Sequence, residues 1–124
     1  MSLIIAGTGT NVGKTMVSAA IMARYASERR VNYLKPVQTG EESDTQTVLQ
    51  LTGVPPERAY PEFARFLLPA SPHFAAESAG HAIGYEKLLH YIGDQTRQTR
   101  SVVELAGGLM APLTRYRTNL DLAR

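Results

Sequence analysis

The residues Gly7-Thr8-Gly9-Thr10-Asn11-Val12-Gly13-Lys14-Thr15 set the architecture expected of this 124-residue chain. They follow a short apolar run, Leu3 to Ala6, and precede a segment from Lys14 to Ser27 that has no Gly or Pro. An apolar run that stops at glycine is typical of a buried strand, and the longer segment favours a helix packed on a sheet. A glycine-rich loop between a strand and a helix is the context of phosphate-binding loops.

Each part of this loop has a physical role in holding an anion. Glycines allow successive backbone N–H groups to turn toward one phosphate, and the helix N-terminus adds partial positive charge. Lys14 is predicted to place an ammonium between terminal phosphates, and the Thr15 hydroxyl to bind Mg²⁺. The spacing is unusual, because five residues rather than the common four separate Gly7 from Gly13. The alternative is a glycine-rich turn that caps a helix, with Lys14 in solvent.

The elements that follow indicate an α/β fold. Val31 to Leu34 reads as a second strand, so that strand, helix and strand form a βαβ unit with parallel pairing and a right-handed crossover. Ser43 with Gln46 three residues later forms a capping box for a helix. The expected later elements are a helix from Asp44 to Leu51, a strand or helix from Phe63 to Leu68, helices from Pro72 to about Ala79 and from Tyr85 to Gln98, a strand from Ser101 to Val103, and a final helix capped by Thr118 or Asn119. The prediction is a P-loop NTPase-like parallel sheet flanked by helices, forming one domain.

Three further charged residues belong to the same prediction. Lys35 directly follows the second strand, Glu104 ends the last one, and Asp44 opens a helix. Loops at the carboxyl ends of parallel strands face the ligand crevice, so Lys14 and Lys35 are expected to meet over the same phosphates. Mg²⁺ is usually held by one or two carboxylates and phosphate oxygens, which suits Asp44 and Glu104. The alternatives are a surface lysine, an acid that stabilises a helix N-terminus, and a strand-end acid in solvent.

The composition of the chain limits its class, its partners and its location. The chain is 44% hydrophobic and 19% charged, which is a globular composition. A net charge of +2 gives no reason to expect nucleic acid as a partner, and the lack of cysteine excludes disulfides and thiolate metal sites. No apolar segment reaches the roughly 20 residues that span a bilayer, and the N-terminus does not read as a signal peptide. The cytoplasm is the expected location, without membrane contact.

The motifs together resemble the dethiobiotin synthetase family over essentially the whole chain. The loop with five intervening residues is this family's own form, so the anomaly favours the resemblance. The residues that carry it are Gly7 to Thr15, Lys35-Pro36-Val37-Gln38-Thr39-Gly40, Ser43-Asp44, Ser71-Pro72-His73, Val103-Glu104-Leu105-Ala106-Gly107-Gly108, Pro112-Leu113 and Asp121-Leu122-Ala123.

The resemblance implies an ATP- and Mg²⁺-dependent ligase of biotin biosynthesis that acts as a homodimer. Such an enzyme carboxylates 7,8-diaminopelargonic acid with CO₂ and closes the ring to dethiobiotin through a phosphorylated carbamate. Carried over by position, Lys14 and Lys35 would stabilise phosphoryl transfer and Thr39 would contact the substrate. The implied metal ligands are Thr15, Asp44 and Glu104. The implied ATP-binding residues are Asn11, Val12, Gly13, Lys14, Thr15, Met16, Asp44, Glu104, Leu105, Ala106 and Gly107.

Two departures from the family pattern qualify this prediction. Leu105 stands where the family usually has glycine, and its side chain is expected to crowd the nucleotide or alter the loop. The family also continues past Asp121-Leu122-Ala123 into strands and helices that carry the base pocket and part of the substrate site. Residues 1–124 are therefore expected to form a partial P-loop domain without the C-terminal strands. Three alternatives follow: the chain is a fragment, it works together with a second polypeptide, or it is inactive.

Two other functions remain open at this point. One is a P-loop regulatory module of the partition-ATPase kind, in which hydrolysis switches partner binding. Such proteins commonly carry a second lysine early in the loop, whereas Thr8, Thr10 and Asn11 occupy that stretch here. The other is a non-catalytic remnant, since half a sheet exposes an edge that needs a partner.

Overall fold

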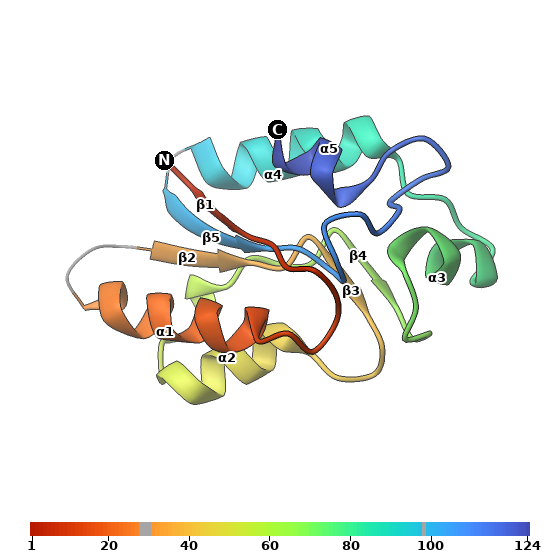
Figure 1. Cartoon of the computed structure of the whole chain (residues 1–124). Helices are drawn as coiled ribbons and strands as arrows, with labels where there is room; N and C mark the ends of the chain where they lie inside the picture. The colour runs from red at the N-terminus through yellow and green to blue at the C-terminus, as the bar shows by residue number, and fades with distance from the viewer. Residues whose placement is uncertain (28–30, 98) are drawn as a thin grey trace.

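The computed structural model describes residues 1–27, 31–97 and 99–124 and has three layers. Helices α1 (Lys14–Ala26) and α2 (Asp44–Thr52) lie on one face of the main sheet, and α4 (Tyr85–Arg97) and α5 (Asn119–Ala123) lie on the other (Figure 1). This arrangement confirms the predicted α/β class, a parallel sheet flanked by helices. None of the helices in the described ranges is both long enough and apolar enough to cross a membrane.

The main sheet contains β1 (Leu3–Ile5), β2 (Val31–Leu34) and β5 (Arg100–Glu104), and β5 lies between the other two. Both outer strands run parallel to β5. The expected direct pairing of the first two strands is therefore wrong, although both belong to one parallel sheet. The reason is burial: all of β5 after its first residue is buried, as a central strand covered on both faces must be. Glu104 thereby emerges between the ends of β1 and β2.

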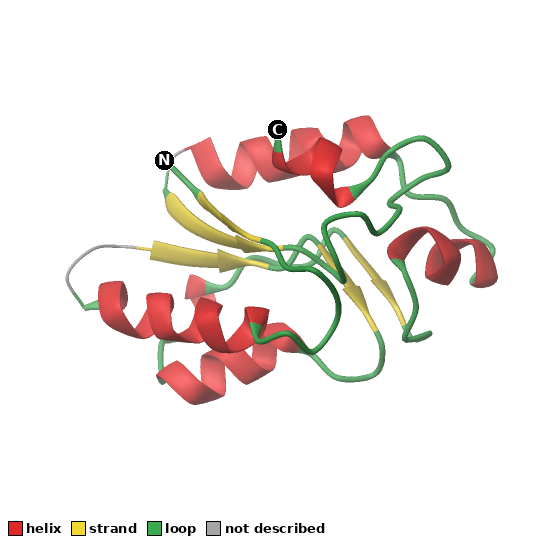
Figure 2. Cartoon of the chain, viewed as in Figure 1, coloured by secondary structure: helices red, strands yellow, loops and turns green. Residues whose placement is uncertain are grey.

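A second, smaller sheet extends the first. It pairs β3 (Val37–Thr39) in parallel with β4 (Ala64–Phe66), and Figure 2 shows these two strands apart from the main three. The ambiguous segment from Phe63 to Leu68 thus contains a strand, and β3 occupies a stretch for which the sequence predicted no helix or strand. The carbonyl of Pro36 accepts the N–H groups of both Phe63 and Ala64, which aligns the pair. The remaining elements are α3 (Pro72–Ser78) and a 3₁₀ turn, η1 (Pro56–Arg58).

The helix boundaries follow the capping residues. Ser43 Oγ accepts the N–H of Gln46 at 3.2 Å, and Gly53, with φ 67°, ends α2 in the left-handed region. Thr118 rather than Asn119 is the N-cap of α5. The predicted end of α4 at residue 98 lies outside the described residues, and the helix is described to Arg97. Asp44 and Lys14 thereby both begin helices beside the carboxyl edge of the sheets.

Helix α1 buries one face and exposes another. Ser18, Ala19 and Met22 are buried, whereas Met16 and Val17 are exposed. The buried face packs with Ile5, Tyr33 and Val102 of the main sheet in one hydrophobic cluster that also contains Val31 and Val48. Since Thr15 and Ser18 are three residues apart, they lie on the same side of the helix, facing the end of β5.

Candidate nucleotide site

A cavity of about 910 Å³ opens at the carboxyl ends of the strands. The phosphate loop, the turn after β2, the start of α2 and the loop after β5 contribute to it. Eleven of the predicted site residues line it: Asn11, Gly13, Lys14, Thr15, Met16, Lys35, Thr39, Asp44, Glu104, Ala106 and Gly107. Two predicted residues, Val12 and Leu105, are not part of its lining. With Thr39 of β3, the edge of the sheets thus brings together groups from five separate segments.

The phosphate loop is already folded around a central position. Gly13 has φ 100° and Asn11 has φ 57°, both in the left-handed region that glycine and asparagine tolerate. Lys14 is buried, and its Nζ donates to the carbonyl of Gly9 within the loop. Burial, together with the nearby Lys35 ammonium, lowers the pKa of Lys14. A polyanion in this cavity would relieve both penalties, which makes the loop a suitable phosphate cradle.

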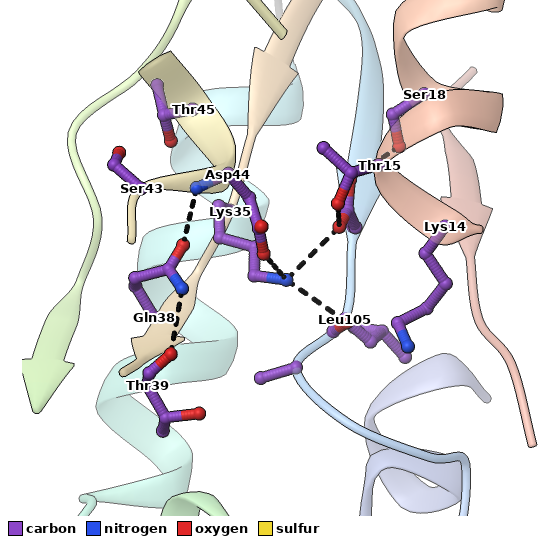
Figure 3. A network of polar contacts seen from close by, with 12 residues as sticks. Lys14, Thr15, Ser18, Lys35, Gln38, Thr39, Ser43, Asp44, Thr45 and Leu105 are labelled. Atoms are coloured by element: carbon purple, nitrogen blue, oxygen red, sulfur yellow. Dashed lines mark hydrogen bonds and ion pairs between the residues drawn. The ribbon is translucent and has the colours of Figure 1, made fainter. Parts of the chain in front are cut away.

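Lys35 forms the centre of a polar network at the same edge. Its side chain is only 3% exposed, and its Nζ lies 2.6 Å from Asp44 Oδ2 and 3.2 Å from Glu104 Oε1. It also donates to the carbonyl of Leu105 at 3.4 Å. Figure 3 shows Lys35, directly after β2, reaching toward Asp44, with Lys14 on the far side of the β5 loop. The two lysines therefore approach one cavity from different elements.

Glu104 is the most buried charge of the site, with 1% of its side chain exposed. Its Oε1 accepts from Thr15 Oγ1 at 2.8 Å as well as from Lys35. Its Oε2 accepts from Ser18 Oγ at 2.7 Å and from Tyr33 Oη at 3.0 Å. A buried carboxylate is costly unless it is paired and hydrogen-bonded, and here each oxygen has two donors.

Asp44 is placed by its neighbours on β3 and by the start of α2. The backbone N–H of Asp44 donates to Gln38 Oε1 at 3.0 Å, and Gln38 Nε2 donates to the carbonyl of Thr39 at 2.9 Å (Figure 3). Gln38 is itself buried. The Asp44 side chain remains 29% exposed, which leaves its carboxylate accessible from the cavity.

The oxygen atoms of Thr15, Asp44 and Glu104 fit a hard divalent cation. Glu104 Oε1 contacts Thr15 Oγ1 and the Lys35 ammonium, and Asp44 Oδ2 contacts the same ammonium. Carboxylate and hydroxyl oxygens are ligands that Mg²⁺ accepts when phosphate oxygens and water complete its shell. Across the described ranges, no group of three or more His, Asp or Glu side chains could hold a metal by itself.

Leu105 does not crowd the cavity, contrary to our expectation. Its side chain is buried with Leu34 and Val103 in a hydrophobic cluster, and only its carbonyl faces the site, as the acceptor for Lys35. A residue after Glu104 points to the opposite side of the extended chain, which is the side covered by α4 and α5. The leucine therefore anchors the loop to the core without entering the nucleotide cavity.

The loop after β5 is fastened to the phosphate loop by close backbone contacts. The N–H of Leu109 donates to the carbonyl of Gly7 at 2.8 Å. A Cβ on Gly108 would lie 2.7 Å from the Thr8 carbonyl oxygen, so only glycine fits there. Buried Asn119 donates from Nδ2 to the carbonyls of Ala106 at 2.6 Å and Gly108 at 2.9 Å. We call residues 106–109 together with Asn119 the loop clamp.

Sequence reasoning missed Ser18, Tyr33, Gln38 and Asn119 as parts of the site. Two of them had a detectable signal. Ser18 follows Thr15 at helical spacing, and Tyr33 precedes Lys35 by two residues in an extended segment, so each shares a face with a predicted residue. Gln38 and Asn119 act through backbone groups, and no residue pattern indicates which carbonyl or N–H a buried amide will meet.

Fold and site together define the class: this is an α/β protein with a P-loop at the carboxyl edge of a parallel sheet. The chain belongs to the family described as AAA domain, whose model matches residues 1–124. It is 47% identical over 122 residues to a protein named ATP-dependent dethiobiotin synthetase BioD from Nitrobacter hamburgensis, covering 97% of this chain and 54% of that one. It is 36% identical over 124 residues to the protein of that name from Leptospira interrogans, covering 100% of this chain and 56% of the relative.

A third protein of the same name, from Rhodopseudomonas palustris, is 47% identical over 122 residues, again with 97% of this chain and 54% of the relative covered. These similarities confirm the resemblance that the motifs indicated. The chain spans about half the length of these curated relatives.

Proposed function

We propose that this chain is the ATP-handling part of a dethiobiotin synthetase, and that residues 1–124 form one P-loop ATP-binding domain. The observation that carries the proposal is the position of Lys14, Lys35, Thr15, Asp44 and Glu104 around one cavity at the carboxyl edge of the sheets. The names of the relatives supply the reaction. A phosphate loop alone would fit many nucleotide-binding proteins, whereas the second buried lysine suits a reaction in which negative charge develops on a transferring phosphoryl group.

The proposed reaction proceeds in three steps. An amine of 7,8-diaminopelargonic acid adds to CO₂ and loses a proton, which gives a carbamate. A carbamate oxygen attacks the γ-phosphorus of ATP, and ADP leaves. The second amine then attacks the carbamate carbon, the C–O bond to phosphate breaks, and the cyclic urea of dethiobiotin forms. Since no group is oxidised or reduced, the protein has only to position reactants and stabilise charge.

The roles of the residues follow from their placement. The loop N–H groups and Lys14 would bind the β- and γ-phosphates, and Lys35 would approach the transferring phosphoryl group from the opposite wall. Thr15, Asp44 and Glu104 would hold Mg²⁺, which neutralises charge on the phosphate oxygens when it is bound. The other predicted residues that line the cavity, Asn11, Gly13, Met16, Ala106 and Gly107, would contact the nucleotide. Lys35 is held by two carboxylates, so it needs no large movement to serve as a preorganised cation.

The diamine would bind on the side of the cavity formed by β3 and the start of α3. Thr39, Gly40 and Ser71 line that side, and Thr39 is the predicted substrate contact. We also propose a homodimer, because the family resemblance implies a substrate site shared between two subunits, and a cytoplasmic location, where ATP and the diamine would both be present.

Turnover by single-residue variants tests this proposal. Lys14→Ala and Lys35→Ala should each lower the chemical step by more than about tenfold, which corresponds to about 1.4 kcal/mol. Lys87→Ala, at an exposed position of α4, is the control and should leave turnover unchanged. ATP hydrolysis that requires both the diamine and bicarbonate supports the ligase. Hydrolysis indifferent to both would instead support the partition-ATPase kind of switch.

A further inference from the structure

The carboxylate of Glu104 has two distinct sides. Its Oε1 meets Thr15 and Lys35, which line the cavity. Its Oε2 meets Ser18 and Tyr33, which are completely buried and belong to the core between α1 and the main sheet. The described contacts therefore divide the two oxygens between the site and the protein interior.

The two core hydroxyls come from independent elements. Ser18 is on α1, one turn beyond the phosphate loop, and Tyr33 is on β2, which pairs with β5 through Tyr33 and Val102. Rotation of the Glu104 carboxylate would break the bonds from both hydroxyls at once. A carboxylate that accepts two fixed bonds on one oxygen must present the other oxygen in a fixed direction.

Neither hydroxyl has an alternative charge state at physiological pH. Burial, and then the negative charge of Glu104, raise the pKa of Tyr33, so the phenol keeps its proton and remains a donor. Serine does not titrate in this range. The arrangement thus satisfies the inner oxygen with two fixed donors, and it directs the outer oxygen toward Thr15 and Lys35 at the cavity.

We propose that Ser18 and Tyr33 are positioning residues that aim Glu104 Oε1 at the metal–phosphate position of the cavity. This inference rests on the proposed function, since it assumes that Glu104 helps to hold a divalent cation with ATP. It extends that function by assigning roles to two residues that do not line the cavity. A purely structural role would predict an effect on folding alone, and a positioning role predicts a specific effect on metal affinity.

The test uses Mn²⁺ as the probe, with ATP, because free Mn²⁺ can be counted by electron paramagnetic resonance. Tyr33→Phe and Ser18→Ala should each weaken Mn²⁺ binding in the presence of ATP by about tenfold or more. Their affinity for ATP without metal should stay close to that of the unmodified protein, although their thermal midpoints should fall because each loses a hydrogen bond to a buried carboxylate. Tyr91→Phe is the matched control, because it removes a tyrosine hydroxyl that donates to the Pro61 carbonyl away from the cavity.

The outcomes separate the inference from the proposed function. If Glu104→Gln loses Mn²⁺ affinity but both hydroxyl variants retain it, the inference is overturned and the proposed function stands. If Glu104→Gln binds Mn²⁺ with ATP as tightly as the unmodified protein, the metal role of Glu104 is wrong and both fail. If metal-free ATP affinity falls as much as Mn²⁺ affinity in both hydroxyl variants, the hydroxyls have a structural role only, which also overturns the inference.

Discussion

The cavity has two walls that differ in burial and charge. The main-sheet wall lies at the ends of β2 and β5, and the small-sheet wall lies at the ends of β3 and β4. The main-sheet wall carries buried charges in a closed network, with Lys35 at 3% and Glu104 at 1% exposure. The small-sheet wall is open: Leu67 is 71% exposed, and Pro69 is exposed beside it. Buried, preorganised charges interact more strongly with a phosphate than exposed ones do. A wall that binds an organic substrate instead needs a complementary shape that the substrate can reach. If the proposed function holds, the buried wall would bind phosphate and the open wall would meet the organic substrate.

Removing the Glu104 carboxylate should give the largest change in the free energy of unfolding, and it tests the contrast between the two walls directly. Glu104→Ala leaves the buried hydroxyls of Ser18 and Tyr33 without their acceptor, and it removes one of the two carboxylates that hold Lys35. Breaking a buried ion pair in this way should cost about 3–5 kcal/mol in the free energy of unfolding, measured by urea denaturation. Thr39→Val, on the small-sheet wall, should change it by no more than about 0.5 kcal/mol.

Equal losses in these two variants would contradict the contrast, because both walls would then be structural. A Glu104→Ala loss below about 1 kcal/mol would contradict it as well, since the network would have relaxed without cost.

A pair of glycine variants tests whether the main-sheet wall is fastened to the phosphate loop. Gly108→Ala places a Cβ 2.7 Å from the Thr8 carbonyl oxygen and 3.0 Å from the Thr8 carbonyl carbon, so backbone must move. We expect a loss of about 1–3 kcal/mol in unfolding free energy and weaker ATP binding by calorimetry. Gly93→Ala is the control: it adds a methyl in open space within α4 and should stabilise the protein by about 0.5–1 kcal/mol.

Similar changes in unfolding free energy for Gly108→Ala and Gly93→Ala would show that the loop after β5 packs only loosely against the phosphate loop. In that case the phosphate loop would have to keep its shape through its own left-handed residues, Asn11 and Gly13.

The sequence predicted the main-sheet wall better than the small-sheet wall, for a physical reason. Phosphate chemistry requires a few residue types at fixed distances from strand ends, so Lys14, Thr15 and Glu104 could be located from local patterns. The strand β3 was missed because Pro36 and Gly40 are typical turn residues and the three residues of Val37–Thr39 are too short to show alternation. Its partner β4 lies far along the chain, and only tertiary structure shows that they pair.

The sequence pattern could not predict the order of the strands in the main sheet either. A strand, helix and strand in succession indicate a parallel crossover, but they do not say whether another strand fits between them. Here β5, from the last third of the chain, occupies that space. The same insertion places Glu104 against Tyr33, and this is why the inner half of the Glu104 network could not be predicted.

The loop clamp offers a smaller test of the same wall. Asn119→Ala removes the two bonds from Nδ2 to the Ala106 and Gly108 carbonyls and leaves both acceptors without that donor. We expect a loss of about 1–3 kcal/mol in unfolding free energy. Asn119→Asp should be at least as damaging, because an ionised carboxylate cannot donate to a carbonyl. Chemical denaturation of both variants checks this, and a harmless Asn119→Asp would show that the clamp does not depend on donation by Asn119.

The smallest expected effect concerns the outer end of the clamp, at the start of α5. Asp121 Oδ2 accepts the N–H of Thr118 at 2.8 Å and its hydroxyl at 3.0 Å, and these bonds lower the pKa of Asp121 from its ordinary value of 3.8. A carboxyl with a lowered pKa stabilises the folded state above its unfolded pKa, and this contribution is lost as the pH falls through the folded value. Asp121→Asn should therefore lower the Tm by about 2 °C near neutral pH and by less near pH 2.5.

Asp94→Asn removes the same charge from the exposed surface of α4 and controls for net charge. A Tm difference between Asp121→Asn and the unmodified protein that stays constant across this range would show that the cap is held by the Thr118 side chain and not by the charge of Asp121.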